Sequence, residues 1–252
     1  MDGEDIREEL SDEKMNHLRY LTPMIDELLA QGGFTLKDMD AIAVSTGPGS
    51  FTGIRIGVST ARGLSQVSGI PLIAVPTLFA FGCSEYEGNR EGTVCPLFNA
   101  RRGQVYAGAY NDFCEVIPGG PYMLDEFLEM VFAWQDGFGP AEEVADTDSS
   151  GKKSEIKKRS GKLLMIGDGV DAYAEKIKEL CAGRNFEMRS RYQDAAGVCE
   201  MAADMMRDPA TFGDRLNLTY DRLEPEYMRM TEAEQRLRDG TLGKGIAGKS
   251  NG

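Results

Sequence analysis

The sequence predicts an α/β protein whose strands are parallel in its first part and antiparallel further on. Helical and extended patterns alternate over the first third of the chain, which is typical of parallel sheets. The extended runs are short, apolar and bounded by glycine or proline, as buried strands are. Beyond residue 92 two extended runs are joined only by Arg101-Arg102-Gly103, so we expect an antiparallel pair there.

The first third is predicted to form helix, strand, helix, strand and helix. Its first helix has one apolar face, formed by Leu18, Leu21, Ile25, Leu28 and Leu29. The predicted elements are a helix from residue 18 to 31, a turn over 36–39, a strand over 41–44, a helix over 54–67, a strand over 71–75 and a helix over 78–86.

The rest of the chain is predicted to begin with a meander and to end with a mixture of strands and helices. The elements are strands over 94–100, 104–110 and 115–117, a helix over 124–134, a strand over 163–166, a helix over 172–181, an edge strand over 186–189 and a helix over 195–206. Residues 137–161 carry few large apolar side chains and are interpreted as a solvated insertion, with a basic docking loop as the alternative. Residues 235–252 are expected to be a disordered tail.

Composition restricts the classes of function. A net charge of -13 repels polyanions, so phosphate contacts to any nucleic acid would have to come from elsewhere. No apolar run approaches the roughly 20 residues that span a bilayer, and the acidic start is unlike a secretory signal, so we expect a cytoplasmic protein without a membrane partner. The cysteines are odd in number and contain no CxxC pair, which argues against a zinc site or a disulfide framework.

A strand, a glycine turn and a helix follow one another at residues 41–69, which is the layout of many phosphate-binding loops. A Walker loop needs a lysine directly after its last glycine, but Ile54 and Arg55 follow Gly53 here. The dinucleotide pattern fails as well, because Thr52 occupies the position of its third glycine. We therefore expect no nucleotide site on this chain.

The helix of this stretch carries small residues at helical spacing. Gly53, Gly57 and Ala61 lie four residues apart and form a stripe poor in side chains. Two interior glycines cost roughly 1 kcal/mol each in helix propensity, so a close contact should offset them. Two interpretations stay open: packing against the domain's own sheet or helices, and a subunit interface.

Several ordered motifs closely resemble those of the TsaB family, the accessory subunits of bacterial tRNA threonylcarbamoyladenosine synthesis. The resemblance extends from about His17 to Glu234. The matching segments are residues 16–25, the GPGSFTGIRIG run at 47–57, NARRGQVY at 99–106, GDG at 167–169, PEYMR at 225–229 and EAE at 232–234.

The resemblance implies a two-lobed actin-like ATPase (ribonuclease H-like) fold. Lobe I would cover residues 1–90 and serve in dimerisation, and lobe II would cover 91–234, with the insertion at 137–161. Family members begin with an apolar strand and a second strand after it, and nothing before Asn16 resembles either. We therefore expect a first lobe that lacks its N-terminal strands, as a truncated chain would.

The resemblance also implies a non-catalytic subunit that pairs with the transferase TsaD or with itself. With the ATPase TsaE, such a complex transfers a threonylcarbamoyl group to N6 of adenosine 37 in tRNA. ATP and metal are expected on the partner subunits, with no cofactor on this chain and tRNA reached only through the complex. The expected interface residues are Leu18, Ile25, Gly53, Ile54, Gly57, Val58, Ala61 and Arg62. Gly47, Pro48, Gly49, Ser50, Arg101 and Arg102 are expected to be structural.

Two enzymatic alternatives belong to the same superfamily, often labelled glycoprotease-like. A metallopeptidase would need a second histidine beside His17, and none is present. A small-molecule kinase would need an aspartate near the missing first strand; Gly167-Asp168-Gly169 could be a phosphate-side turn or a plain strand-to-helix turn. Asn99 and Gln104 replace the family's aspartate and glutamate, which weakens any idea of carboxylate catalysis there.

Four arginines are candidates for contacts. Arg55, Arg62, Arg101 and Arg102 are each expected to cap a helix or to pair with a carboxylate. Arg55 and Arg62 lie near the glycine stripe, where a contact to a partner is the further hypothesis.

Overall fold

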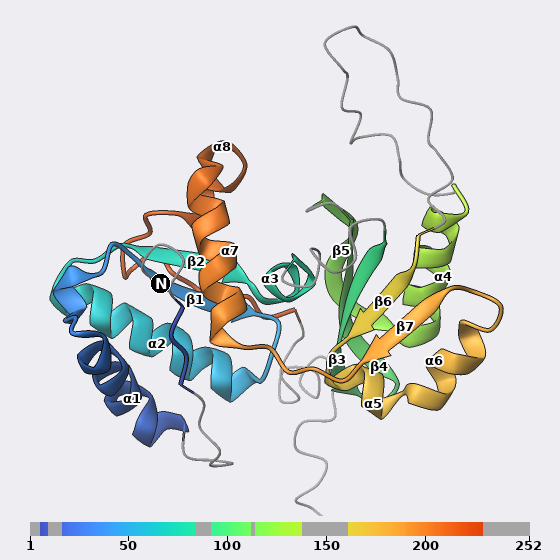
Figure 1. The fold of residues 1–252 in the computed structure, drawn as a ribbon, viewed down its shortest axis with the longest axis horizontal. Coiled ribbons are helices and arrows are strands. Elements are labelled where there is room, and N and C mark those ends of the chain that lie inside the picture. Colours follow the sequence, from blue (N-terminus) through green and yellow to red (C-terminus); the bar gives the residue numbers. More distant parts are fainter. Residues whose placement is uncertain (1–5, 10–16, 84–91, 112–113, 138–160, 229–252) are drawn as a thin grey trace, which may run out of the picture.

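Two separate β-sheets organise the chain (Figure 1). The computed structural model describes residues 6–9, 17–83, 92–111, 114–137 and 161–228. The smaller sheet pairs β1 (Ile42–Gly47) with β2 (Leu72–Pro76) in parallel. The larger sheet has the order β5-β4-β3-β6-β7, antiparallel between β5, β4 and β3 and parallel between β3, β6 and β7. The predicted α/β class is confirmed.

The strands of the larger sheet come from two parts of the chain. They are β3 (Thr93–Arg101), β4 (Gln104–Asn111), β5 (Cys114–Met123), β6 (Leu163–Ile166) and β7 (Phe186–Arg189). The predicted meander is thus present, and β7 lies at the edge as expected. The predicted insertion at 137–161 and tail at 235–252 lie almost wholly outside the described residues.

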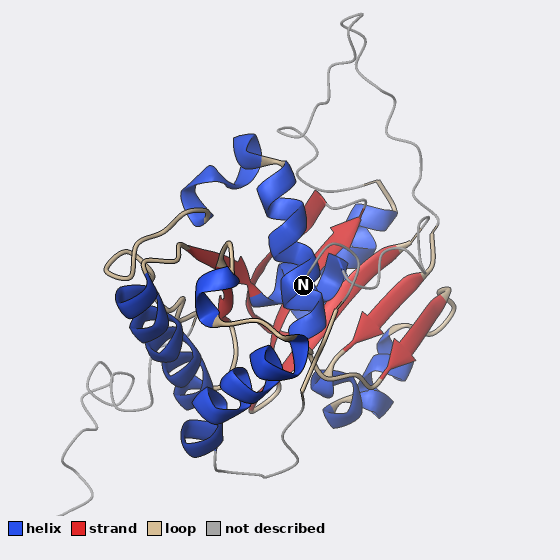
Figure 2. Ribbon diagram, turned by 60° about the vertical axis from the view of Figure 1, so that its left-hand side comes forward, coloured by secondary structure: helices blue, strands red, loops and turns tan. Residues whose placement is uncertain are grey.

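The smaller sheet is covered by helices on both faces. Side chains of successive strand residues point to opposite faces, so Leu72 and Ala74 pack with α2 (Phe51–Ser68), whereas Ile73 and Val75 pack with α7 (Ala195–Arg207). This burial on both faces explains why the runs at 41–44 and 71–75 are continuously apolar. Helix α1 (His17–Gly32) lies beside α2, on the outside of the molecule (Figures 1 and 2).

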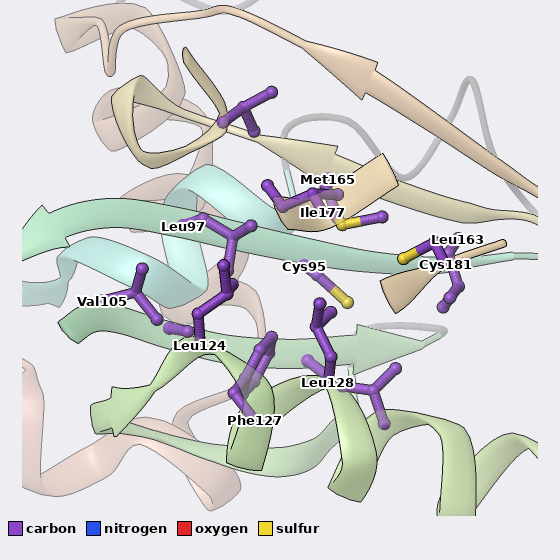
Figure 3. Packing of buried hydrophobic residues seen from close by; sticks show 14 of the residues in the cluster. Cys95, Leu97, Val105, Leu124, Phe127, Leu128, Leu163, Met165, Ile177 and Cys181 are labelled. Carbon is purple, nitrogen blue, oxygen red and sulfur yellow. The ribbon is translucent and has the colours of Figure 1, made fainter. Parts of the chain in front are cut away.

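The larger sheet is built in the same way. One face packs against α4 (Leu124–Gln135) and α6 (Ala174–Leu180), and this is the main core of the protein (Figure 3). Leu97 of β3, Met165 of β6 and Phe127 of α4 meet there, each fully buried. The opposite face packs against Phe81 of α3 (Thr77–Cys83).

Helix α3 lies between the two sheets. Ala80 and Cys83 join the core of the smaller sheet, and Phe81 joins the larger one. Six of its seven residues are buried, so the helix is a shared layer rather than a surface element.

The chain returns to the smaller sheet after β7. Helix α7 covers one face of that sheet, and Leu218 pairs with Leu72 at its edge. In place of a boundary at residue 90 alone, we propose a division by sheet: residues 17–83 and 195–228 around one, and 92–189 around the other. The described part of the first sheet holds two strands, β1 and β2.

Three details differ from the sequence prediction. The helix predicted over 172–181 is split into α5 (Asp168–Ala172) and α6, with Tyr173 between them. Two short elements were not predicted, α8 (Pro209–Phe212) and a 3-10 turn at Gly213–Arg215. Segments of this length leave too little apolar periodicity to be recognised.

Candidate partner-binding surface

The turn between β1 and α2 is closed by the chain's own C-terminal part. Gly47 has φ +136°, and a β-carbon there would lie 2.3 Å from the carbonyl oxygen of Glu226. Only glycine fits such an approach. The Gly47 N–H donates to Thr77 Oγ1 at 3.2 Å, and Pro48, which follows a cis peptide bond, is buried. The glycine at 47 therefore serves internal packing and not a ligand.

Glu226 is held by three hydrogen bonds, two of them to Thr46 in β1. Its backbone N–H donates to the carbonyl oxygen of Thr46 at 2.8 Å. Its carboxylate accepts from the hydroxyl of Thr46, which is fully buried, at 3.2 Å, and from Arg215 Nη1 at 2.5 Å. The PEYMR motif and the GPGSFTG motif thus meet in space, a contact that sequence spacing alone could not reveal.

An aromatic and cationic cluster lies beside this contact, at the start of α2. The rings of Phe51 and Tyr227 lie 4.9 Å apart, and the Arg55 guanidinium lies 4.2 Å from the centre of the Phe51 ring. Arg55 Nε donates to the Tyr227 hydroxyl at 2.8 Å. Phe51 is 38% exposed and Tyr227 43% exposed. We call Phe51, Arg55 and Tyr227 the Phe51 cluster; aromatic and arginine side chains of this kind are enriched at protein interfaces.

The expected interface residues of α2 separate into two groups. Val58 and Ala61 are 3% and 5% exposed and pack against the smaller sheet, and half-buried Ile54 lies beside them. A β-carbon on Gly57 would lie 3.6 Å from Val44 Cγ2 of β1, whereas Gly53 is exposed. Packing against the chain's own sheet therefore explains the small residues at 57 and 61. Val58 and Ala61 hold α2 against that sheet.

The other expected interface residues lie around the same helix pair. Ile25 is half-buried on α1, and Leu18 belongs to α1, with its side chain outside the described part of the structure. Arg62 is half-buried near Asp221. The pKa of Asp221 lies below its usual range, chiefly because the Thr219 hydroxyl bonds to its carboxylate, with smaller contributions from the charges of Arg222 and Arg62.

Of the remaining residues that were expected to be structural, Ser50 has a clear local role. Ser50 is the N-cap of α2, and its hydroxyl accepts from the Gly53 N–H at 3.4 Å. Gly49 is exposed, and a β-carbon on it would lie 3.6 Å from Ile54, an ordinary contact. Arg101 and Arg102 belong to the turn between β3 and β4 and are both exposed.

The GDG segment is a strand-to-helix turn packed against β3. A β-carbon on Gly167 would lie 2.3 Å from the Leu97 carbonyl oxygen, and one on Gly169 would lie 2.7 Å from it. The Asp168 carboxylate accepts from the Asn99 N–H at 3.0 Å. Both glycines and the aspartate are thus used in joining this turn to β3, which favours the structural interpretation over a phosphate-side turn.

The described residues contain no group of three or more histidine, cysteine, aspartate or glutamate side chains that could hold a metal ion. Cys83, Cys95, Cys114, Cys181 and Cys199 are all free thiols. Burial raises the pKa of Cys83 to about 12 and that of Cys181 to about 11. Among the helices that the structure describes, none is both long and apolar enough to cross a membrane.

Comparison with known proteins identifies the class to which this chain belongs. The family model for TsaD, tRNA N6-adenosine threonylcarbamoyltransferase, matches residues 11–213. Two solved structures from Pseudomonas aeruginosa, YeaZ and an uncharacterised protein with similarity to peptidase YeaZ, share the fold at a TM-score of 0.57 each. They are 22% and 23% identical and cover 85% and 84% of this chain, and 86% and 84% of their own. The fold is that of the two-lobed actin-like ATPases.

The sequence relatives are more specific. The tRNA threonylcarbamoyladenosine biosynthesis protein TsaB of Bacillus subtilis is 38% identical over 228 residues, which are 88% of this chain and 84% of the relative. TsaB of Haemophilus influenzae is 39% identical over 68% of this chain and 66% of its own length. The chain belongs to the TsaB family. These relatives favour an accessory role in tRNA modification over a metallopeptidase or a small-molecule kinase.

Proposed function

We propose that this chain is the accessory subunit that binds the TsaD transferase and supports the formation of N6-threonylcarbamoyladenosine at position 37 of tRNA. The observation that carries the proposal is the 38% identity to a TsaB protein along 88% of the chain. That span is long enough to include both the GPGSFTG motif and much of the second sheet.

We place the binding surface on α1 and the accessible side of α2. Gly53, Arg62 and Ile25 line it, and the exposed Phe51 cluster adjoins it, whereas Gly57 faces Val44 of the chain's own sheet. Leu18 and Ile54 stay in the proposed set, whereas Val58 and Ala61 act by holding α2 against its own sheet. A heterodimer with TsaD is the main assembly, a homodimer through the same surface is its competitor, and TsaE joins the complex.

The chemistry is proposed to belong to the partner subunits. The Glu226 carbonyl oxygen occupies the space above Gly47 where a phosphate group would need to approach. In the same way, the Leu97 carbonyl oxygen occupies the space beside Gly167 and Gly169 that a phosphate group would need. We therefore assign ATP and metal binding to TsaD and TsaE, and we place the complex in the cytoplasm, where its tRNA substrate is.

Substitution of one exposed glycine on α2 tests the surface. Gly53→Trp places a large side chain on the proposed interface, and the nearest atom to the new β-carbon is Ser50 Cβ at 3.4 Å, which the fold can accommodate. Gly213→Trp is the control, because a β-carbon there has nothing within 4 Å and the residue lies in the 3-10 turn at Gly213–Arg215, outside both helices of the proposed surface.

The measurement is co-purification with TsaD, followed by the threonylcarbamoyladenosine content of tRNA from the reconstituted complex. Gly53→Trp should lower both by at least about ten-fold, since steric exclusion from an interface commonly costs more than 1.4 kcal/mol. Gly213→Trp should change neither. If both variants assemble like the unsubstituted chain, the surface is wrong; if the unsubstituted chain never assembles with TsaD, the proposed function is wrong.

A further inference from the structure

The turn between β3 and β4 holds two arginines in a backbone conformation that arginine rarely adopts. Arg101 and Gln104 are paired, so Arg102 and Gly103 are the two central residues of the turn. Their φ angles are +56° and +80°, and Arg101 before them has φ +64° at a register shift of the strand. Two-residue turns with positive φ at both centres strongly prefer Asn-Gly. Arginine at 101 and 102 is thus unfavourable for the turn itself.

The turn is held by an arrangement of hydrogen bonds to a neighbouring element. The Asn99 side-chain oxygen accepts from the Arg101 N–H at 2.8 Å. The Tyr173 hydroxyl accepts from the Gly103 N–H at 3.1 Å and lies 3.3 Å from the Asn99 side-chain oxygen, to which it donates. With Asp168 bonded to the Asn99 N–H, the turn is fixed to the segment between β6 and α6. The two arginines therefore project from a preorganised support.

Neither guanidinium is used within the described part of the chain. Arg101 and Arg102 are both exposed, and neither makes an ion pair or a side-chain hydrogen bond with a residue that the structure describes. Neither arginine caps a helix or pairs with a carboxylate among the described residues, and for the rest of the chain that expectation stays a prediction. The flanking Asn99 and Gln104 are neutral, and the carboxylate of Asp168 is bonded to the base of the turn.

We infer that this turn is a docking point for the phosphate backbone of RNA. The inference rests on the proposed function, which supplies an RNA substrate. Adjacent like charges that find no partner among the described residues suit a ligand with regularly repeated negative charges, and guanidinium groups bind phosphate oxygens in a bidentate manner. In a chain of net charge -13 such a contact acts at short range, so it is strongest when a partner subunit has brought the RNA close.

The inference makes this chain a direct contributor to RNA binding, whereas the family resemblance placed tRNA only in indirect contact. An acidic surface of a partner protein is the competing ligand, and the experiment separates the two. Its probe is an unmodified tRNA carrying adenosine at position 37.

The experiment compares the complex with TsaD for three variants of the full chain. R101Q/R102Q removes both charges, and R101K/R102K keeps the charges without the bidentate geometry. The control, K37Q/R207Q, removes two exposed positive charges elsewhere: Lys37 lies in the turn after α1, and Arg207 ends α7. For each complex, tRNA affinity is measured as a function of salt concentration. Titration of the isolated chain at low salt is the second arm.

R101Q/R102Q should lower the affinity of the complex for tRNA about ten-fold and reduce the salt slope by about 1.5, since each lost phosphate contact removes roughly 0.7 to 0.9. R101K/R102K should retain the slope and lose part of the affinity, and K37Q/R207Q should match the unsubstituted complex. Unchanged affinity and slope for R101Q/R102Q would overturn the inference.

Two further outcomes keep the inference and the proposed function apart. R101Q/R102Q could co-elute less with TsaD, while the fraction that still assembles binds tRNA with full affinity. That outcome would make the turn a protein contact and overturn the inference. If the unsubstituted chain does not assemble with TsaD, the proposed function fails. In that case the isolated chain tests the inference. Binding of tRNA by the isolated chain that R101Q/R102Q loses would support the inference, and the absence of such binding would overturn it.

Discussion

Gly47 and Glu226 are far apart in the sequence, yet a β-carbon on Gly47 would lie only 2.3 Å from the carbonyl oxygen of Glu226. The neighbouring Thr46 carbonyl oxygen accepts from the Glu226 N–H at 2.8 Å, and this hydrogen bond keeps Glu226 beside Gly47. A stretch that has the layout of a phosphate loop is thereby filled by the protein itself. Its glycine is required by the fold.

Gly47→Ala should therefore destabilise the protein strongly. The new methyl group would meet a backbone oxygen, and φ +136° is open essentially to glycine alone, so we expect a loss of about 3 kcal/mol or more in the free energy of unfolding. Urea denaturation followed by circular dichroism measures this change.

Gly49→Ala is the matched control for that substitution. It lies in the same turn, but its β-carbon would make only an ordinary contact with Ile54 at 3.6 Å. Its effect should stay below about 1 kcal/mol. Equal losses at the two positions would show that the contact with Glu226 is not what requires glycine at 47.

Arg102→Gly should stabilise the protein. Glycine has no β-carbon and adopts φ +56° without cost, so relief of the left-handed conformation should add about 1 kcal/mol. Arg102→Ile should act in the opposite direction, because a β-branched side chain is disfavoured there. The two variants are compared by thermal unfolding, and a lower melting temperature for Arg102→Gly would contradict the assignment of strain to this turn.

Glu187 on the edge strand β7 should contribute to acid sensitivity. Hydrogen bonds from Arg189 and Lys162 lower its pKa to about 2, against 4.5 as the ordinary value. The carboxylate binds its proton more readily in the unfolded chain, so its stabilising contribution is present above pH 4.5 and is lost as the pH falls towards 2.

Glu187→Gln should therefore flatten the dependence of stability on pH in that window, and leave the dependence above pH 5 unchanged. Glu179→Gln, at an exposed position of α6, is the control and should keep the slope of the unsubstituted protein. An identical acid profile for Glu187→Gln and the unsubstituted chain would show that the pair with Arg189 and Lys162 is not maintained in solution.

Local patterns were sufficient for most of the secondary structure. The apolar runs at 41–44, 71–75 and 163–166 all form strands, because buried strands of this kind need an apolar side chain at nearly every position. The helix over 172–181 was predicted as one piece because its apolar spacing does not reveal the break at Tyr173. That break frees the Tyr173 hydroxyl to reach the turn at Gly103, 3.1 Å away.

The interface prediction shows the limit of helical spacing more clearly. Helical spacing places Gly53, Gly57 and Ala61 in one stripe, but it does not say what the stripe packs against. That depends on the position of the sheet. The structure places Ala61 in the core and leaves Gly53 exposed. The side of α2 that is available to another protein is thus decided by which side β1 and β2 occupy.

The sequence by itself determined the α/β class, the order of the elements and the family, because these depend on local periodicity and on ordered motifs. Only the tertiary structure decided what the turn at Gly47 holds. Its occupant, Glu226, is distant in sequence and carries no motif that names its partner, so the contact exists only after both sheets and the returning chain are in place. The stretch that has the layout of a phosphate loop is therefore filled by a contact within the protein, beside the exposed cluster of Phe51, Arg55 and Tyr227.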